Sequence, residues 1–365
     1  MSFFDEPNQS YFEPVSRRPR RASGLVFLSL FAISLIGLVF LPTPYVIEQP
    51  GPVFNVLSVE NGESVITVEN AKTYETKGDL DLLTVSVLGS RENTPSWLEL
   101  GWAWLDPAKV ITPIDAIFPE GQTTKQAEVE SAAMMEQSQQ DAIAVALKKL
   151  GYKVPFEVYI SEVLKGAPAS GILRATDFVK TASGIQVQSV EQLRAILNES
   201  NGQPVAVEIE RAGKLQTVEV TPTKNEAGDY RMGVLAGIKY DFPIQVNLKL
   251  SDVGGPSGGM IFALGIYDIL TPGYLVGGEK VAGTGTIDGN GNIGPIGGIR
   301  QKMHGAQRAG ASYFLAPADN CSQVIGNIPE GLKVFKVSKF DEALEIANAI
   351  GSDGNLNDLP TCSAK

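Results

Sequence analysis

The sequence predicts a mixed α+β chain with an N-terminal transmembrane helix, a β-rich region after it and two folded domains beyond that. Three observations lead to this prediction. Residues 24–41 form an uncharged apolar run, short strand patterns begin near residue 45, and helical patterns alternate with strand runs after residue 124. A chain of 365 residues is long enough for two or three domains with their own cores.

Composition excludes several functional classes. The chain carries 30 Lys and Arg against 41 Asp and Glu, a net charge of −11, which disfavours a nucleic-acid binder. Its only histidine is His304 and its only cysteines are Cys321 and Cys362. A Ser-His-Asp triad, a Cys-His dyad, a multi-histidine metal site and a zinc finger are therefore nearly excluded, unless His304 acts alone. We expect neither a cofactor nor a metal, and any hydrolytic base must be found elsewhere.

The N-terminus reads as a membrane anchor. Residues 1–23 are expected to be a cytoplasmic tail and residues 24–41 a single-pass helix of about 27 Å. Four arginines lie within positions 17–21, whereas the next basic residue is Lys72, so the remainder of the chain is expected outside the cytoplasm. A cleaved secretory signal would give the same compartment. Against it, the apolar run is long and is followed by prolines instead of an A-x-A site.

Export to an oxidising compartment bears on the two cysteines. Cys321 and Cys362 either form a disulfide that ties down the C-terminal tail, residues 351–365, or remain unpaired thiols. The sequence leaves these alternatives open. We expect the tail to be mobile unless Cys362 is bridged.

The exported part begins with strands and a long helix. Residues 45–123 contain alternating runs such as Ser64–Val68 and Leu82–Val87, and form a β-rich region. All three tryptophans lie in Pro95–Trp104, to which we assign no element. Residues 124–150 show apolar residues at helical spacing without glycine or proline, and predict a helix that stops at Gly151.

Residues 151–223 have a different pattern. A strand around Val158–Ile160 precedes a Gly-Ala-Pro-Ala turn, a helix follows from Ser189 to Leu197, and a hairpin turns at Arg211–Lys214. This order resembles a bacterial PDZ domain. The resemblance implies peptide binding at a sheet edge, with the carboxylate-binding loop expected around Gly151–Phe156. A purely structural or substrate-orienting role is the alternative.

Residues 232–350 carry the chemistry. Pro256-Ser257-Gly258-Gly259-Met260 joins a strand to an apolar helix, where a serine hydroxyl is exposed next to backbone N–H groups. Alone, this turn would also suit a simple tight connection. Further along the chain, Pro295-Ile296-Gly297-Gly298-Ile299-Arg300-Gln301-Lys302 opens another helix. The two motifs in this order resemble the proteolytic domain of Lon-type serine proteases. The whole chain resembles the bacterial membrane-anchored PDZ-Lon proteases.

The resemblance implies that Ser257 is the nucleophile and Lys302 its base, with Thr284 as a hydrogen-bonding orienting residue. A lysine serves as base when burial disfavours its charged form, which fits a chain with one histidine. The alternative for Lys302 is a surface helix lysine. His304 points about 200° around the helix from Lys302 and is expected to be an ordinary helix residue. Asp252 is a weaker candidate for a third member.

Lon proteases normally carry an ATPase, but the P-loop pattern Gly-x4-Gly-Lys-Ser/Thr does not occur here. The sequence therefore predicts a membrane-anchored, ATP-independent serine endopeptidase that cuts unfolded or flexible polypeptides outside the cytoplasm. Expected partners are polypeptide substrates, the membrane and possible further copies of the chain, with no nucleic acid. A catalytically silent PDZ scaffold and a protease that releases fragments of neighbouring membrane proteins are the alternatives.

Overall fold

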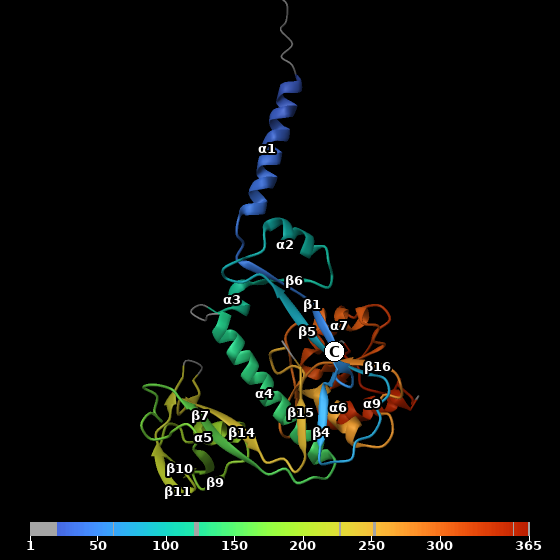
Figure 1. Cartoon of the computed structure of the whole chain (residues 1–365). Coiled ribbons are helices and arrows are strands. Elements are labelled where there is room, and N and C mark those ends of the chain that lie inside the picture. Colours follow the sequence, from blue (N-terminus) through green and yellow to red (C-terminus); the bar gives the residue numbers. More distant parts are fainter. Residues whose placement is uncertain are drawn as a thin grey trace, which may run out of the picture.

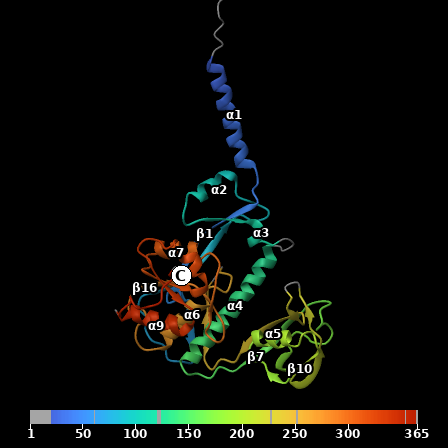
Figure 2. The ribbon, with the colours of Figure 1, turned by 180° about the vertical axis from the view of Figure 1, so that it is seen from behind.

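The structure is a computed structural model that describes residues 20–60, 62–119, 124–225, 228–250, 253–352 and 354–363. Its elements confirm the mixed α+β class. A helix projects from a larger body, and a smaller β-rich unit lies beside that body (Figure 1). The view from behind shows the long helix α4 running between body and unit (Figure 2).

The larger body is built on a mixed six-stranded sheet, in the order β20-β19-β16-β5-β1-β6. The first four of these strands run parallel, while β1 is antiparallel to both its neighbours. The bounds are β1 (Tyr45–Asn55), β5 (Asp79–Leu88), β6 (Val110–Pro113), β16 (Lys280–Gly283), β19 (Tyr313–Pro317) and β20 (Lys333–Val337).

The expected β-rich region 45–123 is therefore not a separate unit. Its strands β1, β5 and β6 continue the sheet begun by β16, β19 and β20 from the other end of the chain. The reason is that β5 and β16 pair in parallel. Without this pairing, the strands from each end of the chain would leave an edge with unpaired backbone groups. Three two-stranded pairs complete the body: β2 (Val59–Glu60) with β3 (Glu63–Ser64), β4 (Ile66–Glu69) with β15 (Gln245–Leu248), and β17 (Thr286–Ile287) with β18 (Ile293–Gly294).

Helices cover both faces of this sheet. Buried residues of α4 (Thr124–Lys149), α6 (Gly259–Leu270) and α9 (Phe340–Gly351) pack in one core with Leu80 and Leu82. On the opposite face, α7 (Ile299–Arg308) and α8 (Cys321–Val324) pack against Leu83 and Phe314, with the short η1 (Ala318–Asn320) before α8. Because strand side chains alternate between faces, Leu82 and Leu83 belong to different cores.

The smaller unit, called here the PDZ-like unit, contains an antiparallel sheet in the order β11-β10-β8-β7-β14, with β9 paired to β8. Its elements are β7 (Phe156–Val163), β8 (Phe178–Ala182), β9 (Ile185–Gln186), α5 (Val190–Glu199), β10 (Val205–Arg211), β11 (Lys214–Val220), β12 (Thr223–Lys224), β13 (Tyr230–Arg231) and β14 (Val234–Tyr240). The unit extends past the expected boundary at residue 223, since β14 pairs along β7. Ser189 caps α5 by accepting a hydrogen bond from the Gln192 N–H.

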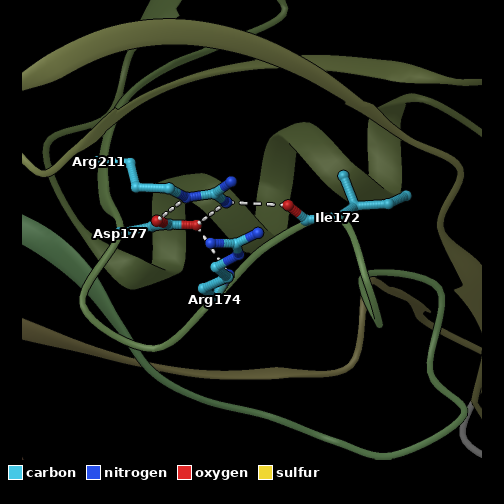
Figure 3. A network of polar contacts seen from close by, with 4 residues as sticks. All are labelled: Ile172, Arg174, Asp177 and Arg211. Carbon is cyan, nitrogen blue, oxygen red and sulfur yellow. Dashed lines mark hydrogen bonds and ion pairs between the residues drawn. The ribbon is translucent and has the colours of Figure 1, made fainter.

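A buried ion pair holds the interior of this unit together (Figure 3). The Arg211 guanidinium donates to both carboxylate oxygens of Asp177, at 2.7 and 2.6 Å, and to the Ile172 carbonyl at 2.9 Å. The backbone N–H of Arg174 donates to the same carboxylate. Asp177 is fully buried, and its carboxylate accepts all three of these hydrogen bonds.

The tryptophan segment, to which we assigned no element, forms α2 (Trp97–Trp104), followed by β6 and the short α3 (Ile114–Ile117). Ser96 and Glu99 form a reciprocal capping box at its start. The Ser-x-x-Glu spacing of Ser96 and Glu99 is the sequence pattern that indicates this helix, and our sequence prediction did not use it.

Helix α1 (Arg20–Phe40) contains most of the segment expected to be the anchor, residues 24–41. Among the helices that the structure describes, none is both long and apolar enough to cross a bilayer, so the transmembrane expectation is not supported. Residues 1–19 of the expected cytoplasmic tail lie outside the described residues, as do the side chains of residues 20–23, 35, 36 and 38–40.

Cys321 and Cys362 form a disulfide, which resolves the alternatives that the sequence left open. A second contact attaches the tail near this disulfide: the Lys336 N–H donates to the Pro360 carbonyl at 2.8 Å. The described part of the C-terminal tail is therefore tied to β20.

Candidate active site

Ser257 lies in the loop 253–258, called here the nucleophile loop, which connects β15 to α6. Gly258 is the N-cap of α6, so Ser257 immediately precedes the helix start. The first N–H groups of a helix have no partner within it. The Met260 N–H donates to the Gly285 carbonyl at 3.3 Å, and the other N–H groups at the start of α6 are suited to stabilising an anion that forms beside Ser257.

Close packing explains the glycine that opens α6. A Cβ atom on Gly259 would come within 2.5 Å of the Ser138 Oγ on α4 and 2.7 Å of the Ile287 Cγ2. The absence of a side chain lets α4 and the β17 strand approach the helix start closely. Glycine at position 259 thus allows the close packing that positions Ser257 against the rest of the body.

Lys302 projects from the first turn of α7 to Ser257. Its Nζ donates to the Ser257 Oγ at 2.7 Å and to the Thr284 Oγ1 at 2.9 Å, and the residue is only 3% exposed. The structure thus brings together all three residues singled out from the sequence. The alternative of a surface lysine is wrong.

Thr284 holds both members of the pair. Besides accepting from Lys302, its hydroxyl donates to the Ser257 carbonyl at 3.0 Å, and the neighbouring Gly285 N–H donates to the same carbonyl at 2.8 Å. The residue lies between β16 and β17 and is buried. It therefore positions both the backbone of Ser257 and the amine of Lys302.

The electrostatics of Lys302 are set by burial. Removal from water lowers the pKa of its amine from 10.5 to about 7, since the low-dielectric interior disfavours the charged form. The partners of its Nζ are hydroxyl groups and carry no negative charge. A large fraction of the amine is therefore neutral near pH 7 and able to accept a proton.

The nucleophile loop is held from α4 by contacts that sequence reasoning missed. The Ser138 Oγ donates to the Pro256 carbonyl at 2.8 Å, and the Gly255 N–H donates to the Ser131 carbonyl at 3.0 Å. Ser131 and Ser138 are seven residues apart and so share one helix face. That spacing of small polar residues was the only signal available, and it is common in helices that carry no function.

A groove of about 830 Å³ opens beside the serine. It is lined by Ser257, Lys302, the nucleophile loop and the second half of β5. Strand β16 pairs with β5 only as far as Leu82, so Leu83–Leu88 has β1 as its one partner among the described strands. The open edge runs into the groove and can accept an extended peptide.

The remaining candidates lie apart from this chemistry. His304 is half-buried on α7, where burial and the nearby Arg308 and Arg300 lower its pKa. Asp252 lies outside the described residues. Within the described part of the chain, no cluster of three or more His, Cys, Asp or Glu side chains could hold a metal ion.

A second groove, of about 540 Å³, lies between α5 and β14 of the PDZ-like unit. Its lining combines apolar side chains with three basic ones, Arg194, Lys224 and Arg231. Residues 231–233, just before β14, border it, whereas none of the expected loop Gly151–Phe156 does. The edge strand beside α5 is β14, the last strand of the unit, and not β7, and the carboxylate-binding role expected of Gly151–Phe156 stays a prediction.

Comparison with known proteins places a family on one part of the chain. Residues 245–349 match the Lon protease (S16) C-terminal proteolytic domain. Lon protease 1 of Bacillus subtilis is 41% identical over 113 residues, and Lon protease of Azospirillum brasilense is 34% identical over 112 residues. Each alignment covers 30% of this chain, and the chain spans 14% of the length of these relatives. The family match and these relatives support a serine peptidase.

Similar solved structures include two PDZ domains. The PDZ domains of SdrC-like proteins from Listeria innocua and Listeria monocytogenes are 23% and 20% identical to this chain over the aligned residues. The alignments cover 22% of this chain and 92% and 85% of those chains, each with a TM-score of 0.21.

Proposed function

We propose that this chain is a serine endopeptidase that cuts polypeptides with Ser257 as nucleophile, Lys302 as general base and Thr284 as orienting residue. One observation carries the proposal: a buried lysine amine lies 2.7 Å from a serine hydroxyl at the start of a helix. With its pKa near 7, the amine is matched to proton transfer at neutral pH.

The reaction follows from this geometry. The neutral Nζ of Lys302 takes the proton of the Ser257 hydroxyl while Oγ bonds to the scissile carbonyl carbon. The N–H groups at the start of α6 stabilise the resulting oxyanion. The carbon–nitrogen bond then breaks, and Lys302 returns the proton to the leaving amine. A water molecule, deprotonated by the same amine, hydrolyses the acyl-enzyme and restores Ser257.

The groove favours an extended substrate. Main-chain groups of a peptide can pair with the open edge of β5, which delivers its carbonyl carbon to Ser257. A segment buried in a folded protein cannot present such a strand without unfolding first. The sequence contains no P-loop pattern, so we propose ATP-independent cleavage of unfolded or flexible polypeptides.

The groove of the PDZ-like unit is proposed to select substrates. An apolar floor beside an edge strand suits a peptide side chain. Arg194 and Lys224 supply positive charge that complements a terminal carboxylate, whereas Arg231 is paired with Asp229 at 2.7 Å. A peptide ending in an apolar residue should bind more weakly when amidated at its C-terminus. Fluorescence anisotropy with the free-acid and amidated forms measures this difference, and equal affinities would contradict carboxylate recognition.

We also propose that the chain is attached to the cell membrane through residues 24–41, with the protease on the extracytoplasmic side. The arginine cluster before an uncharged run favours this orientation. The Cys321–Cys362 disulfide is typical of proteins outside the cytoplasm. Carbonate extraction of membranes and protease accessibility of intact spheroplasts test attachment and side separately.

The catalytic proposal is tested with a fluorescently labelled unstructured protein as substrate. The wild type should cleave it, whereas Ser257→Ala and Lys302→Ala should not. Ser322→Ala, a change at an exposed serine, serves as the matched control and should cleave normally. If the wild type is folded and cleaves nothing, the chain is a catalytically silent scaffold. Comparison of the membrane-protein fragments released by wild type and Ser257→Ala then tests whether its substrates are membrane neighbours.

A further inference from the structure

Helix α2 is apolar on both faces although it lies on the surface. Toward the body, Leu100 and Ala103 are buried against Ile47, with Tyr45 and Ile111 beside them. Its single charged residue, Glu99, is engaged at the helix start, where it accepts hydrogen bonds from Ser96. A surface helix normally turns charged or polar residues outward, so the outer face of α2 needs an explanation.

That outer face carries every tryptophan of the chain. Trp97, Trp102 and Trp104 are 43%, 68% and 81% exposed, and Leu98 and Leu105 are exposed beside them. At 100° per residue, these five positions fall on one continuous side of the helix, opposite Ala103. Three exposed tryptophans and two leucines on one surface mark a site of interaction with another apolar phase.

The position of α2 indicates what that phase is. A β-bridge between Pro42 and Ser96 joins the start of α2 to the chain just beyond the end of α1. The Thr43 hydroxyl donates to the Pro95 carbonyl at 2.8 Å, and the Thr43 N–H donates to the Thr94 hydroxyl. Figures 1 and 2 both show α2 lying at the base of α1. Apolar side chains in the described part of α1, among them Phe27 and Phe31, are exposed as well.

We propose that the outer face of α2 binds a lipid bilayer at the boundary between headgroups and acyl chains. This inference rests on the proposed membrane attachment through residues 24–41. If α1 is held by a membrane, the contacts between residues 42–43 and 94–96 keep α2 close to that membrane. Tryptophan is the side chain enriched at this depth, because its ring is apolar and its N–H is polar. The helix would then fix the body against the membrane surface in one orientation.

The test uses the tryptophans themselves. Because α2 contains all three, the intrinsic tryptophan fluorescence of the full chain reports on this helix alone. The full chain is reconstituted into vesicles of phosphatidylcholine and phosphatidylglycerol, with and without lipids brominated along one acyl chain. We expect emission shifted to the blue relative to tryptophan in water, and strong loss of emission with bromine near the headgroups. Bromine placed deep in the acyl chain should quench less.

Flotation of the same vesicles separates this inference from the attachment on which it rests. If the chain floats but its emission is unquenched and unshifted, α2 faces water and the inference fails while attachment stands. If the chain does not float, both fail. Blue-shifted emission that bromine does not quench, and that depends on protein concentration, would assign the face to a second copy of the chain and overturn the lipid assignment.

Variants identify the residues responsible. Trp102→Ser with Trp104→Ser leaves Trp97 as the sole reporter and removes the two most exposed rings. The lipid assignment predicts that Trp97 then loses most of its blue shift and quenching, since the face no longer enters the bilayer. The matched pair Trp102→Phe with Trp104→Phe keeps the face apolar and should retain both signals. Identical behaviour of the two variants would overturn the assignment, and circular dichroism verifies that both remain folded.

Discussion

Two buried ionisable side chains in this molecule differ in the charge of their partners. Lys302, in the larger body, contacts two hydroxyl groups, whereas Asp177, in the PDZ-like unit, receives two hydrogen bonds from Arg211 and one from the Arg174 N–H. Burial lowers the pKa of Lys302 to about 7. Burial by itself raises the pKa of Asp177, but the hydrogen bonds from Arg211 and Arg174 outweigh it and the pKa is lowered.

The difference shows how the same loss of water serves two purposes. A buried charge that is paired and fully hydrogen-bonded stays charged and holds a structure together. A buried amine without an opposite charge gives up its proton and becomes a base. The contrast leads to opposite expectations for the removal of the two cationic side chains.

The largest expected effect is that of Lys302→Met. Cleavage should fall by at least about 10⁴-fold, because the base is removed. Stability at pH 7 should nevertheless rise, on the order of 1 kcal/mol or more, since the unfolded chain no longer gains a proton that the folded chain excludes. Peptidase assays and urea unfolding measure the two. Lys214→Met, at an exposed lysine, is the control, and a destabilised Lys302→Met would contradict the unpaired-amine interpretation.

Arg211→Met should lower stability and leave cleavage unchanged, the reverse of Lys302→Met. It leaves the Asp177 carboxylate buried without its charge partner, which costs about 3 kcal/mol in the stability of the PDZ-like unit. Cleavage of an unstructured substrate should be unchanged under native conditions, since Ser257 and Lys302 lie in the larger body and not in the PDZ-like unit. Arg174→Met is the matched control. Its hydrogen bond to Asp177 runs through the backbone N–H and is kept, so only the weaker charge interaction of its side chain is lost and the cost should be much smaller.

The pH dependence of this loss has a fixed sign. The pKa of Asp177 is lowered on folding, so its stabilising contribution is present above the unfolded value of about 3.9 and disappears as the pH falls. The stability difference between wild type and Arg211→Met should therefore shrink in acid. A difference that is constant from neutral pH to pH 3 would show that the guanidinium acts through packing alone.

The activity of the wild type should depend on pH through Lys302. Because only the neutral amine accepts a proton, kcat/KM should fall about tenfold per pH unit below pH 7 and reach a plateau above it. Stopped assays between pH 5.5 and 9 measure the profile, with circular dichroism to show that the fold persists. A midpoint near 10, the ordinary value for lysine, would mean that the amine is solvated during catalysis.

The smallest expected effect is that of Ser138→Ala. Loss of the hydrogen bond to the Pro256 carbonyl should lower kcat about fivefold, near 1 kcal/mol, with little change in KM, because the loop that carries Ser257 becomes less well positioned. Ser131→Ala is the control, since Ser131 holds Gly255 through its backbone carbonyl. Equal losses in both variants would point to a general weakening of the contact between α4 and α6.

Local sequence patterns were enough to single out much of this arrangement. The α+β class and the helix cap at Ser189 follow from residue spacing and capping chemistry, which depend on neighbours a few positions away. Ser257, Lys302 and Thr284 were identified by short motifs that resemble a known family. The Ser-x-x-Glu spacing at the start of α2 also indicates a helix, although we assigned no element to this tryptophan-rich segment.

The tertiary structure decided what local pattern does not contain. Ser257 and Lys302 are 45 positions apart and Ser138 and Pro256 are 118 apart, so their contacts depend on how distant segments pack. The same holds for the mixed sheet shared by both ends of the chain and for the position of the groove beside β14. The order of residues specifies which side chains are present to do chemistry. Only the fold removed water from Lys302 and gave Asp177 its partner, because burial and pairing are properties of the surroundings in space.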